Sequence, residues 1–329
     1  MGPSVVVEHY CTYFDRNFLP RGLALYLSLE RHLSDFRLWV LCLDSETFAA
    51  LSGLGRPKIC PIRLEDFERG DDALLEAKQN RTRIEYYFTC TPSLPLFVLR
   101  HSDAKAVTYV DADLFFYASP SLLLEEVGAA SIAIVPHRRV PEGPDPFGDY
   151  NVGWLRFLGD EMGVACLGWW RDRCNEWCYD RVDGDRFADQ KYLNHFPARY
   201  DSVAILEQKG ANLAPWNVGR WEVRIEDASV RIDEDPLIFY HFHGLKLVTR
   251  WLVDPGLEGY ATSPPKVFTQ HILRPYLRDL KIARRVSGGW QPTTGIKRGP
   301  ECPSLSARMK TPLRHLRSLL TGQYVIHFG

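Results

Sequence analysis

Short apolar runs alternate with helically periodic stretches along the first half of the chain. An apolar run without polar alternation is typical of a strand buried on both faces, whereas apolar residues three and four apart predict an amphipathic helix. These patterns predict strands at 5–11, 38–43, 59–64, 106–110 and 131–135, and helices at 18–33 and 72–100. Strand, helix and strand repeated in this order favour an α/β fold, with a mostly parallel sheet between two layers of helices.

The pattern changes after a loop rich in proline and glycine at 136–149. The second half predicts a strand at 150–157, a tryptophan-rich helix at 160–179, a short helix at 187–196 and a strand at 237–241. We therefore expect one domain over 1–270, with a first half at about 1–135 and a second half at about 136–270, followed by a tail at 271–329.

Charge separates this tail from the rest of the chain. The formal net charge of all 329 residues is −1, but 271–329 holds eleven Lys or Arg against Asp279 and Glu301, which leaves about +9 there and about −10 before it. The near-zero total predicts no general attraction to nucleic acid. The tail allows two interpretations: solvated surface charge, or contact with an anionic membrane, where each Lys or Arg contributes about 1 kcal/mol.

The eight cysteines mostly lie in apolar runs and form no Cys-x-x-Cys pair, so we interpret them as reduced core residues of a cytoplasmic protein. Cys174 and Cys178 are spaced for a thiolate metal site on a helix. They continue an apolar stripe with Cys166 and Trp170, however, which favours packing. No run reaches the ~20 apolar residues that span a bilayer.

Two aspartates give the strongest chemical signal. Asp111 and Asp113 directly follow the predicted strand 106–110, and residues i and i+2 of a strand point the same way. Two unpaired carboxylates at a buried strand end repel each other and lose hydration, so we expect a cation between them. Oxygen ligands suit Mg²⁺ or Mn²⁺, which also hold substrate phosphates. Two alternatives fit the pair alone: caps of the next helix, or an aspartyl-phosphate phosphatase.

Two polar pairs lie further along the chain. Asn151 and Gly153 open the strand at 150–157, where an amide beside a residue without a side chain could bind sugar hydroxyls. Asp189 and Gln190 stand near the start of a short helix. An acid at that position is compatible with both a helix cap and an active-site role.

The strand at 237–241 leads into two imidazoles, a glycine and a lysine. His241 and His243, combined with carboxylates elsewhere, would form a mixed nitrogen and oxygen shell that favours manganese over magnesium. Lys246 could place a positive charge on a diphosphate. The pattern leaves open which imidazole binds the metal.

Together these motifs resemble the GT-A glycosyltransferases, and within them glycosyltransferase family 8, which includes glycogenin and bacterial lipooligosaccharide galactosyltransferases. The resemblance covers about residues 4–250. It rests on the order and spacing of Tyr109-Val110-Asp111-Ala112-Asp113-Leu114, Tyr150-Asn151-Val152-Gly153, Asp189-Gln190 with Leu193-Asn194, and His241-Phe242-His243-Gly244 with Lys246. It implies a Rossmann-like fold with a mixed, mostly parallel sheet flanked by helices, whose first half binds the nucleotide and whose second half binds sugar and acceptor.

The resemblance also implies residue roles. Asp111, Asp113 and His241 would hold Mn²⁺ or Mg²⁺ on the nucleotide diphosphate, with His243 as the alternative ligand because Lys246 comes one residue earlier than in the family pattern. The implied catalytic residues are Asp189 and Gln190, and the implied donor-binding residues are Tyr13, Asp15, Asn17, Asn151, Gly153, Gly244 and Lys246. The family's basic residue before the aspartate pair has two candidates, Arg81 and Arg83.

The activity implied is metal-dependent transfer of a sugar from a nucleotide-diphosphate sugar, UDP in this family, to a hydroxyl of a glycan or lipid-linked acceptor with retention. Same-face attack is favoured, with a covalent intermediate on Asp189 as second choice. The location would be cytoplasmic, with the tail at the inner membrane face. The alternatives are an aspartyl-phosphate-type phosphatase and a non-catalytic relative that binds nucleotide-sugar.

Overall fold

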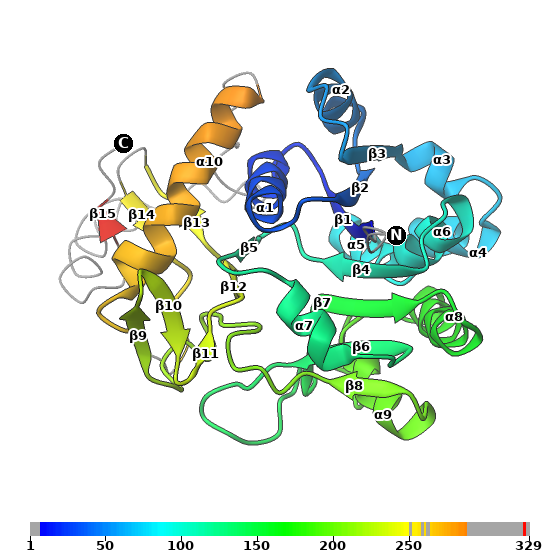
Figure 1. Cartoon of the computed structure of the whole chain (residues 1–329). Coiled ribbons are helices and arrows are strands. Elements are labelled where there is room, and N and C mark those ends of the chain that lie inside the picture. The colour runs from blue at the N-terminus through cyan, green and yellow to red at the C-terminus, as the bar shows by residue number, and fades with distance from the viewer. Residues whose placement is uncertain (1–6, 250–251, 258–259, 261–263, 288–324, 327–329) are drawn as a thin grey trace, which may run out of the picture.

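The computed structural model describes residues 7–249, 252–257, 260, 264–287 and 325–326. A seven-stranded sheet forms its centre, in the order β3 (Ile59–Arg63), β2 (Phe36–Cys42), β1 (Glu8–Phe14), β4 (Ala106–Val110), β7 (Tyr150–Leu158), β6 (Ile132–Pro136) and β8 (Val203–Ile205) (Figure 1). Neighbouring strands are parallel, except that β7 runs antiparallel to β4 and β6. The predicted α/β fold with a mixed, mostly parallel sheet is confirmed.

Helices cover both faces of this sheet (Figure 1). One face packs against α1 (Leu19–His32), α2 (Ser45–Gly53) and α7 (Ser121–Val127). The other packs against α3 (Leu64–Glu68), α4 (Asp72–Gln79), α5 (Arg83–Cys90), α6 (Ser93–His101), α8 (Glu161–Glu176), the 3₁₀ helix η1 (Lys191–His195) and α9 (Phe196–Arg199). Strand side chains alternate between the two cores: Tyr10 and Val110 belong to the first, Cys11 and Tyr109 to the second.

A third core lies beside the main sheet. The short strands β5 (Leu114–Phe116) and β12 (Phe239–His241) pair there in antiparallel fashion. Around them lie β9 (Val223–Glu226), β10 (Ser229–Ile232), β11 (Asp235–Pro236), β13 (Lys246–Leu247), β14 (Leu252–Asp254), β15 (Val325–Ile326), the π-helical turn η2 (Phe268–Leu273) and α10 (Arg274–Val286). This core positions residues 239–241 against the end of β4.

The predicted tail begins with a helix that packs on the body. α10 lies alongside α1 (Figure 1), and Arg31 of α1 pairs with the buried Asp279 of α10. Residues 288–324 and 327–329 of the tail lie outside the described residues. The boundary at 270, like the division into two halves, stays a prediction.

Local signals explain where the structure departs from the expected elements. The region 72–100 forms three helices because α4 ends at Gln79 and a capping box between Thr82 and Glu85 starts α5. Pro92 then precedes α6. The helices α2 and α7 and the strand β5 were not predicted from the hydrophobic pattern. Cys174 and Cys178 lie buried in the second core, in agreement with the packing interpretation.

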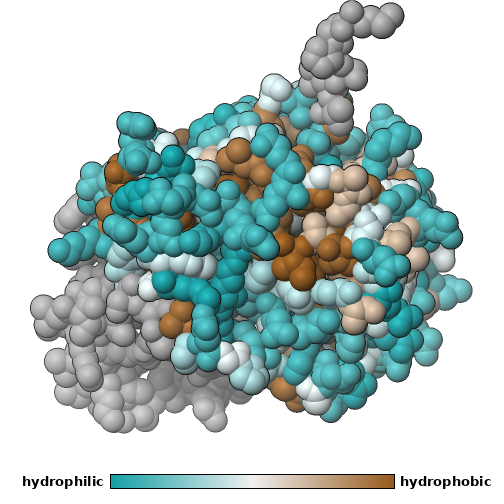
Figure 2. Space-filling view, turned by 60° about the horizontal axis from the view of Figure 1, so that its bottom comes forward, coloured by the Kyte–Doolittle hydropathy of each residue, from teal (hydrophilic) through white to brown (hydrophobic). Residues whose placement is uncertain are grey.

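The surface view in Figure 2 shows a mostly hydrophilic face, with hydrophobic side chains gathered near its middle and smaller hydrophobic spots elsewhere. Within the part of the chain that the structure describes, every helix is too short or too polar to cross a membrane.

Candidate active site

The two aspartates stand at the carboxyl end of β4. The backbone N–H of Asp111 donates to the carbonyl of Gly153 on β7 (3.0 Å), which continues the β4–β7 ladder by one residue. The N–H of Leu114 then donates to the carbonyl of Asp111 (3.1 Å) in the turn that leads to β5. Both carboxylates therefore project from a short turn between two strands, as the strand-end position predicted.

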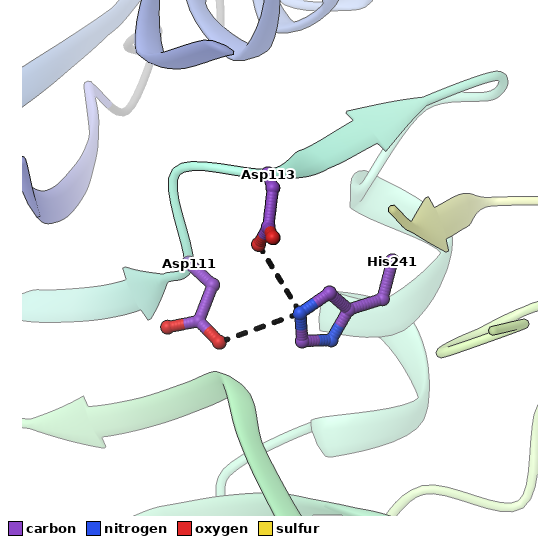
Figure 3. Close-up of side chains that lie close together, drawn as sticks. All are labelled: Asp111, Asp113 and His241. Atoms are coloured by element: carbon purple, nitrogen blue, oxygen red, sulfur yellow. Dashed lines mark ion pairs between the residues drawn. The ribbon is translucent and has the colours of Figure 1, made fainter. Parts of the chain in front are cut away.

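His241 reaches the aspartates because its strand pairs with β5. In the β5–β12 register His241 lies opposite Leu114, the residue after Asp113. Its Nε2 is 3.1 Å from Oδ1 of Asp113 and 3.6 Å from Oδ2 of Asp111 (Figure 3). One ligand atom from each of the three residues lies within 4.8 Å of the others.

Burial and neighbouring charges have opposite effects on the pKa values of these three side chains. Burial alone would lower the pKa of His241, but Asp113 and then Asp111 outweigh it and raise this pKa above its usual value. Burial alone would raise the pKa of Asp113, yet His241 and Arg21 outweigh it and lower this pKa. For Asp111, burial dominates and raises the pKa. Positive charge at Nε2 thus stabilises the pair of carboxylates.

The donor set fits a divalent cation. Two carboxylates and an imidazole are the mixed oxygen and nitrogen donors that suit manganese and related ions. Asp113 and His241 are buried, whereas the Asp111 side chain is 29% exposed, which leaves one side of the group accessible from solvent. Among the described residues this is the group of three or more ligands that could hold a metal.

The other residues of the 241–246 motif lie apart from this group. His243 is exposed, and its ring centroid lies 5.7 Å from that of His241. Gly244 has φ +72°, a conformation that glycine adopts without strain, and it turns the chain away after β12. Lys246 is exposed in β13. The geometry therefore brings His241, and not His243, together with the aspartates.

Asn151 and Gly153 lie on β7 and are direct neighbours of His241. The Asn151 amide contacts His241, Gly153, His137 and Gln190 at distances between 3.0 and 3.3 Å. The Gln190 amide also accepts from the N–H of Val152 (3.3 Å) and donates to the carbonyl of Phe147 (3.0 Å). Both amides thus have protein partners for their donors and acceptors.

Asp189 lies buried next to the site, 5% exposed. Ala188 before it has φ +45°, and the indole N–H of Trp170 donates to the Asp189 carbonyl (2.8 Å), so the backbone is held firmly. Burial raises the pKa of its carboxyl to about 7, despite a hydrogen bond from Thr91. Thr91 also bonds the Tyr13 hydroxyl (3.2 Å). Tyr13 is therefore half-buried, with its hydroxyl close to this acid, and its role in donor binding stays a prediction.

Asp15 and Asn17, two further donor-binding candidates, stabilise a turn. The Asp15 carboxylate accepts from the backbone N–H groups of Asn17 (2.8 Å) and Phe18 (3.3 Å) and from the Asn17 amide (3.0 Å). This turn joins β1 to α1 at the same end of the sheet as Asp111.

Sequence reasoning missed three residues around the site. Arg21 of α1 places its guanidinium 3.8 Å from Oδ2 of Asp113, and Tyr109 donates its hydroxyl to Oδ1 of Asp111 (2.9 Å). His137 contacts Asn151, as described above. An arginine in the first turns of a helix gives no signal, but His137 lies two residues after the predicted strand 131–135, and that position could have identified it. Arg81, one of the two candidates for the family's basic residue, bonds the Tyr179 hydroxyl and the carbonyl of Asn175.

The fold is shared with solved glycosyltransferase structures. The galactosyltransferase LgtC, in complex with donor and acceptor sugar analogues, matches with a TM-score of 0.50 over 88% of this chain and 98% of that chain, at 15% identity. The glycosyltransferase GlyE of Streptococcus pneumoniae matches with a TM-score of 0.50 over 88% of this chain and 66% of that chain, also at 15% identity. These likenesses define the fold as GT-A.

Sequence comparison gives closer relatives. The chain is 32% identical over 279 residues to the uncharacterized protein YfnD of Bacillus subtilis, which covers 83% of this chain and 88% of YfnD. It is 31% identical over 251 residues to the uncharacterized protein YfnF of the same organism, with 73% and 82% covered. No protein-family model matches. The chain belongs to the family of YfnD and YfnF.

Proposed function

We propose that this protein is a metal-dependent glycosyltransferase of the family 8 type. It would transfer a sugar from a nucleotide-diphosphate sugar, with UDP as the first choice, to a hydroxyl of a glycan or lipid-linked acceptor. The observation that carries the proposal is the convergence of Asp111, Asp113 and His241 at the end of β4 in a GT-A fold.

The charges around this group suit a nucleotide diphosphate. When bound, a divalent cation would supply positive charge that offsets the charge growing on the departing diphosphate. Arg21, 3.8 Å from Asp113 and partly exposed, could bond a phosphate oxygen on the same side. Lys246 is exposed in β13, and we propose it as a second cationic residue for the diphosphate. Manganese is preferred over magnesium because one ligand is an imidazole.

Retention by same-face attack is the mechanism we favour. The bond between sugar C1 and the phosphate oxygen breaks, the acceptor oxygen bonds C1, and the acceptor proton passes to the released diphosphate oxygen. Gln190 is uncharged and its amide is held by Asn151, Val152 and Phe147, which suits an orienting role. Asp189, with a pKa of about 7, would hold a sugar hydroxyl rather than attack C1.

The two alternatives make different demands. An aspartyl-phosphate-type phosphatase needs a downstream lysine and a further acidic pair that serves the same metal. Among the described residues, the third possible ligand of the group is the imidazole of His241. A non-catalytic relative would bind the donor without turnover. Both differ from the proposal in what they release from a UDP-sugar.

The test starts with thermal shift of the purified protein against UDP, GDP, CDP and dTDP, each with and without Mn²⁺. We expect stabilisation by one nucleotide that requires Mn²⁺, because the metal links the diphosphate to the aspartates. Asp113→Ala should abolish that shift. Asp103→Ala, at a side chain that is 97% exposed, should retain it and serves as the matched control.

Turnover then separates the alternatives. We expect release of the nucleoside diphosphate from the matching nucleotide-sugar, lost in Asp111→Ala and Asp113→Ala. Binding without release would favour the non-catalytic relative. Hydrolysis of a phosphate monoester with no nucleotide response would favour the phosphatase and contradict the proposal.

We also propose that the protein contacts an anionic membrane surface through α10. Arg274, Lys281 and Arg285 are exposed on one side of this helix, and the aliphatic Ile282 and Val286, 41% and 46% exposed, lie among them. Such a face suits a surface that carries negative headgroups. Sedimentation with vesicles containing phosphatidylserine should exceed that with phosphatidylcholine alone, and Lys281→Glu with Arg285→Glu should abolish the difference. Equal sedimentation would contradict the contact.

A cytoplasmic location also stays a prediction.

A further inference from the structure

We propose that Asn151, supported by His137, fixes the tautomer of His241 so that the imidazole presents Nε2 to a divalent cation. This is a positioning role, and it rests on the metal site of the proposed function. It also gives Asn151 a different task from the sugar binding that its motif implied.

The orientation of both buried amides is set by backbone groups. The N–H of Gly153 can only donate, so the Asn151 atom 3.0 Å from it must be the oxygen Oδ1. The N–H of Val152 fixes Oε1 of Gln190 in the same way (3.3 Å), and Nε2 of Gln190 donates to the carbonyl of Phe147. Nδ2 of Asn151 therefore donates to Oε1 of Gln190 (3.0 Å).

The same logic assigns the proton of His137. Nδ2 of Asn151 also donates to Nε2 of His137 (3.1 Å), so this ring nitrogen carries no hydrogen. The other nitrogen, Nδ1, is protonated and donates to the carbonyl of Gly148 (2.7 Å), which can only accept. His137 is 4% exposed, and burial lowers its pKa to about 4, so the ring stays neutral near pH 7.

His241 receives its tautomer from the remaining lone pair of the Asn151 oxygen. Nδ1 of His241 lies 3.3 Å from Oδ1, and an oxygen that already accepts from Gly153 can only accept again. Nδ1 therefore carries a hydrogen, and the lone pair of a neutral ring must sit on Nε2, the atom that faces Asp113 and Asp111. With two donors and two acceptor sites used, the Asn151 amide has none left for a sugar hydroxyl.

Gly153 gives a second, independent sign that this contact is built into the fold. A Cβ at this position would lie 2.5 Å from Oδ1 of Asn151 and 2.9 Å from Nδ1 of His241. Any side chain there would separate the amide from the imidazole. The glycine of the Asn-x-Gly motif thus makes room for the contact between Asn151 and His241.

The decisive test compares two substitutions of similar size by Mn²⁺ titration calorimetry without nucleotide. Asn151→Leu removes the acceptor for His241, and we expect Mn²⁺ affinity to fall about 10- to 100-fold, as it does when partners of metal-bound histidines are lost. Asn151→Asp loses both donors but keeps an acceptor for Nδ1–H, so it should bind Mn²⁺ at least as tightly as the wild-type protein. Asn80→Leu, at an exposed amide outside the site, is the control for the same amide-to-leucine change and should bind normally.

Two further measurements cover a variant that fails to fold. His137→Phe keeps the ring shape but removes the acceptor for Asn151, and we expect a several-fold loss of affinity. In Mg²⁺-loaded wild-type protein labelled with ¹⁵N-histidine, NMR should place the proton of His241 on Nδ1.

The outcomes separate this inference from the proposed function. If Asp111→Ala abolishes Mn²⁺ binding but Asn151→Leu leaves it unchanged, the positioning role is wrong and the metal site stands. Equal losses in Asn151→Leu and Asn151→Asp would mean a general packing role and would also overturn it. A wild-type protein that does not bind Mn²⁺ overturns both.

Discussion

Asp189 should make the stability of the metal-free protein depend on pH, and Asp189→Asn should remove that dependence. The carboxyl is 5% exposed and lies near Asp111, and the hydrogen bonds from the Thr91 hydroxyl and from its own backbone N–H do not offset its burial. Burial raises its pKa from 3.8 to about 7. The folded state therefore binds a proton more tightly than the unfolded chain, and ionised Asp189 destabilises the fold.

The sign and size of this pH effect follow from the linkage between proton binding and folding. For a raised pKa the favourable contribution is fully present below pH 3.8 and is lost as the pH rises through about 7. The interval between these values corresponds to about 4 kcal/mol, of which about 1.7 kcal/mol is already lost at pH 5. Asparagine keeps the shape and does not titrate. Relative to wild type, Asp189→Asn should therefore gain about 2.5 kcal/mol of unfolding free energy between pH 5 and pH 8.5.

Urea unfolding in the presence of EDTA, followed by circular dichroism at both pH values, measures this difference. EDTA matters because a bound cation would offset the charge of Asp111. Asp201→Asn, at an exposed carboxyl, is the control and should track wild type at both pH values. If the stability gap between Asp189→Asn and wild type is the same at pH 5 and pH 8.5, the carboxyl is ionised in the fold without cost and the reasoning is refuted.

Three further substitutions probe the surroundings of the site. Arg21→Met should weaken UDP binding in the presence of Mn²⁺ about tenfold, because a phosphate oxygen loses its cationic partner. Binding of Mn²⁺ without UDP should be unchanged or tighter, because a positive charge next to Asp113 is removed. Calorimetry that shows an unchanged UDP affinity would exclude the phosphate contact. Gly153→Ala should lower Mn²⁺ affinity about tenfold by pushing His241 from Asn151, and normal affinity would show that the backbone can yield. Arg138→Met should cost about 2 to 4 kcal/mol in urea unfolding because three backbone carbonyls lose their donor, and a loss below about 0.5 kcal/mol would contradict this.

The main sheet and the aspartate pair were predictable because each rests on local pattern. Buried strands such as 106–110 give unbroken apolar runs, and Asp111 and Asp113 stand where such a run ends. The antiparallel direction of β7 is not local. It depends on how the loop at 136–149 returns the chain to β4.

The choice between His241 and His243 could not be made from sequence. Both are spaced to point the same way from one strand, and only the end of β12 at His241 and the turn at Gly244 separate them. The strands that decide the matter, β5 and β12, have three residues each, which is too short for a period to be detected. His137 and Arg21 become visible as neighbours of the site only once distant segments are in contact.

The pairing of β5 with β12 also couples the site to the folding of the whole chain. Leu114 and His241 lie opposite each other although about 125 residues separate them, so the last ligand arrives only after a very large loop has closed. A nascent chain released before residue 241 carries both aspartates but no complete cation site. Because a cation would then bind the finished fold and not its precursors, mass action would favour completion of the topology. Cation binding by Asp111, Asp113 and His241 would thus stabilise the fold only after its last strand pairing has formed.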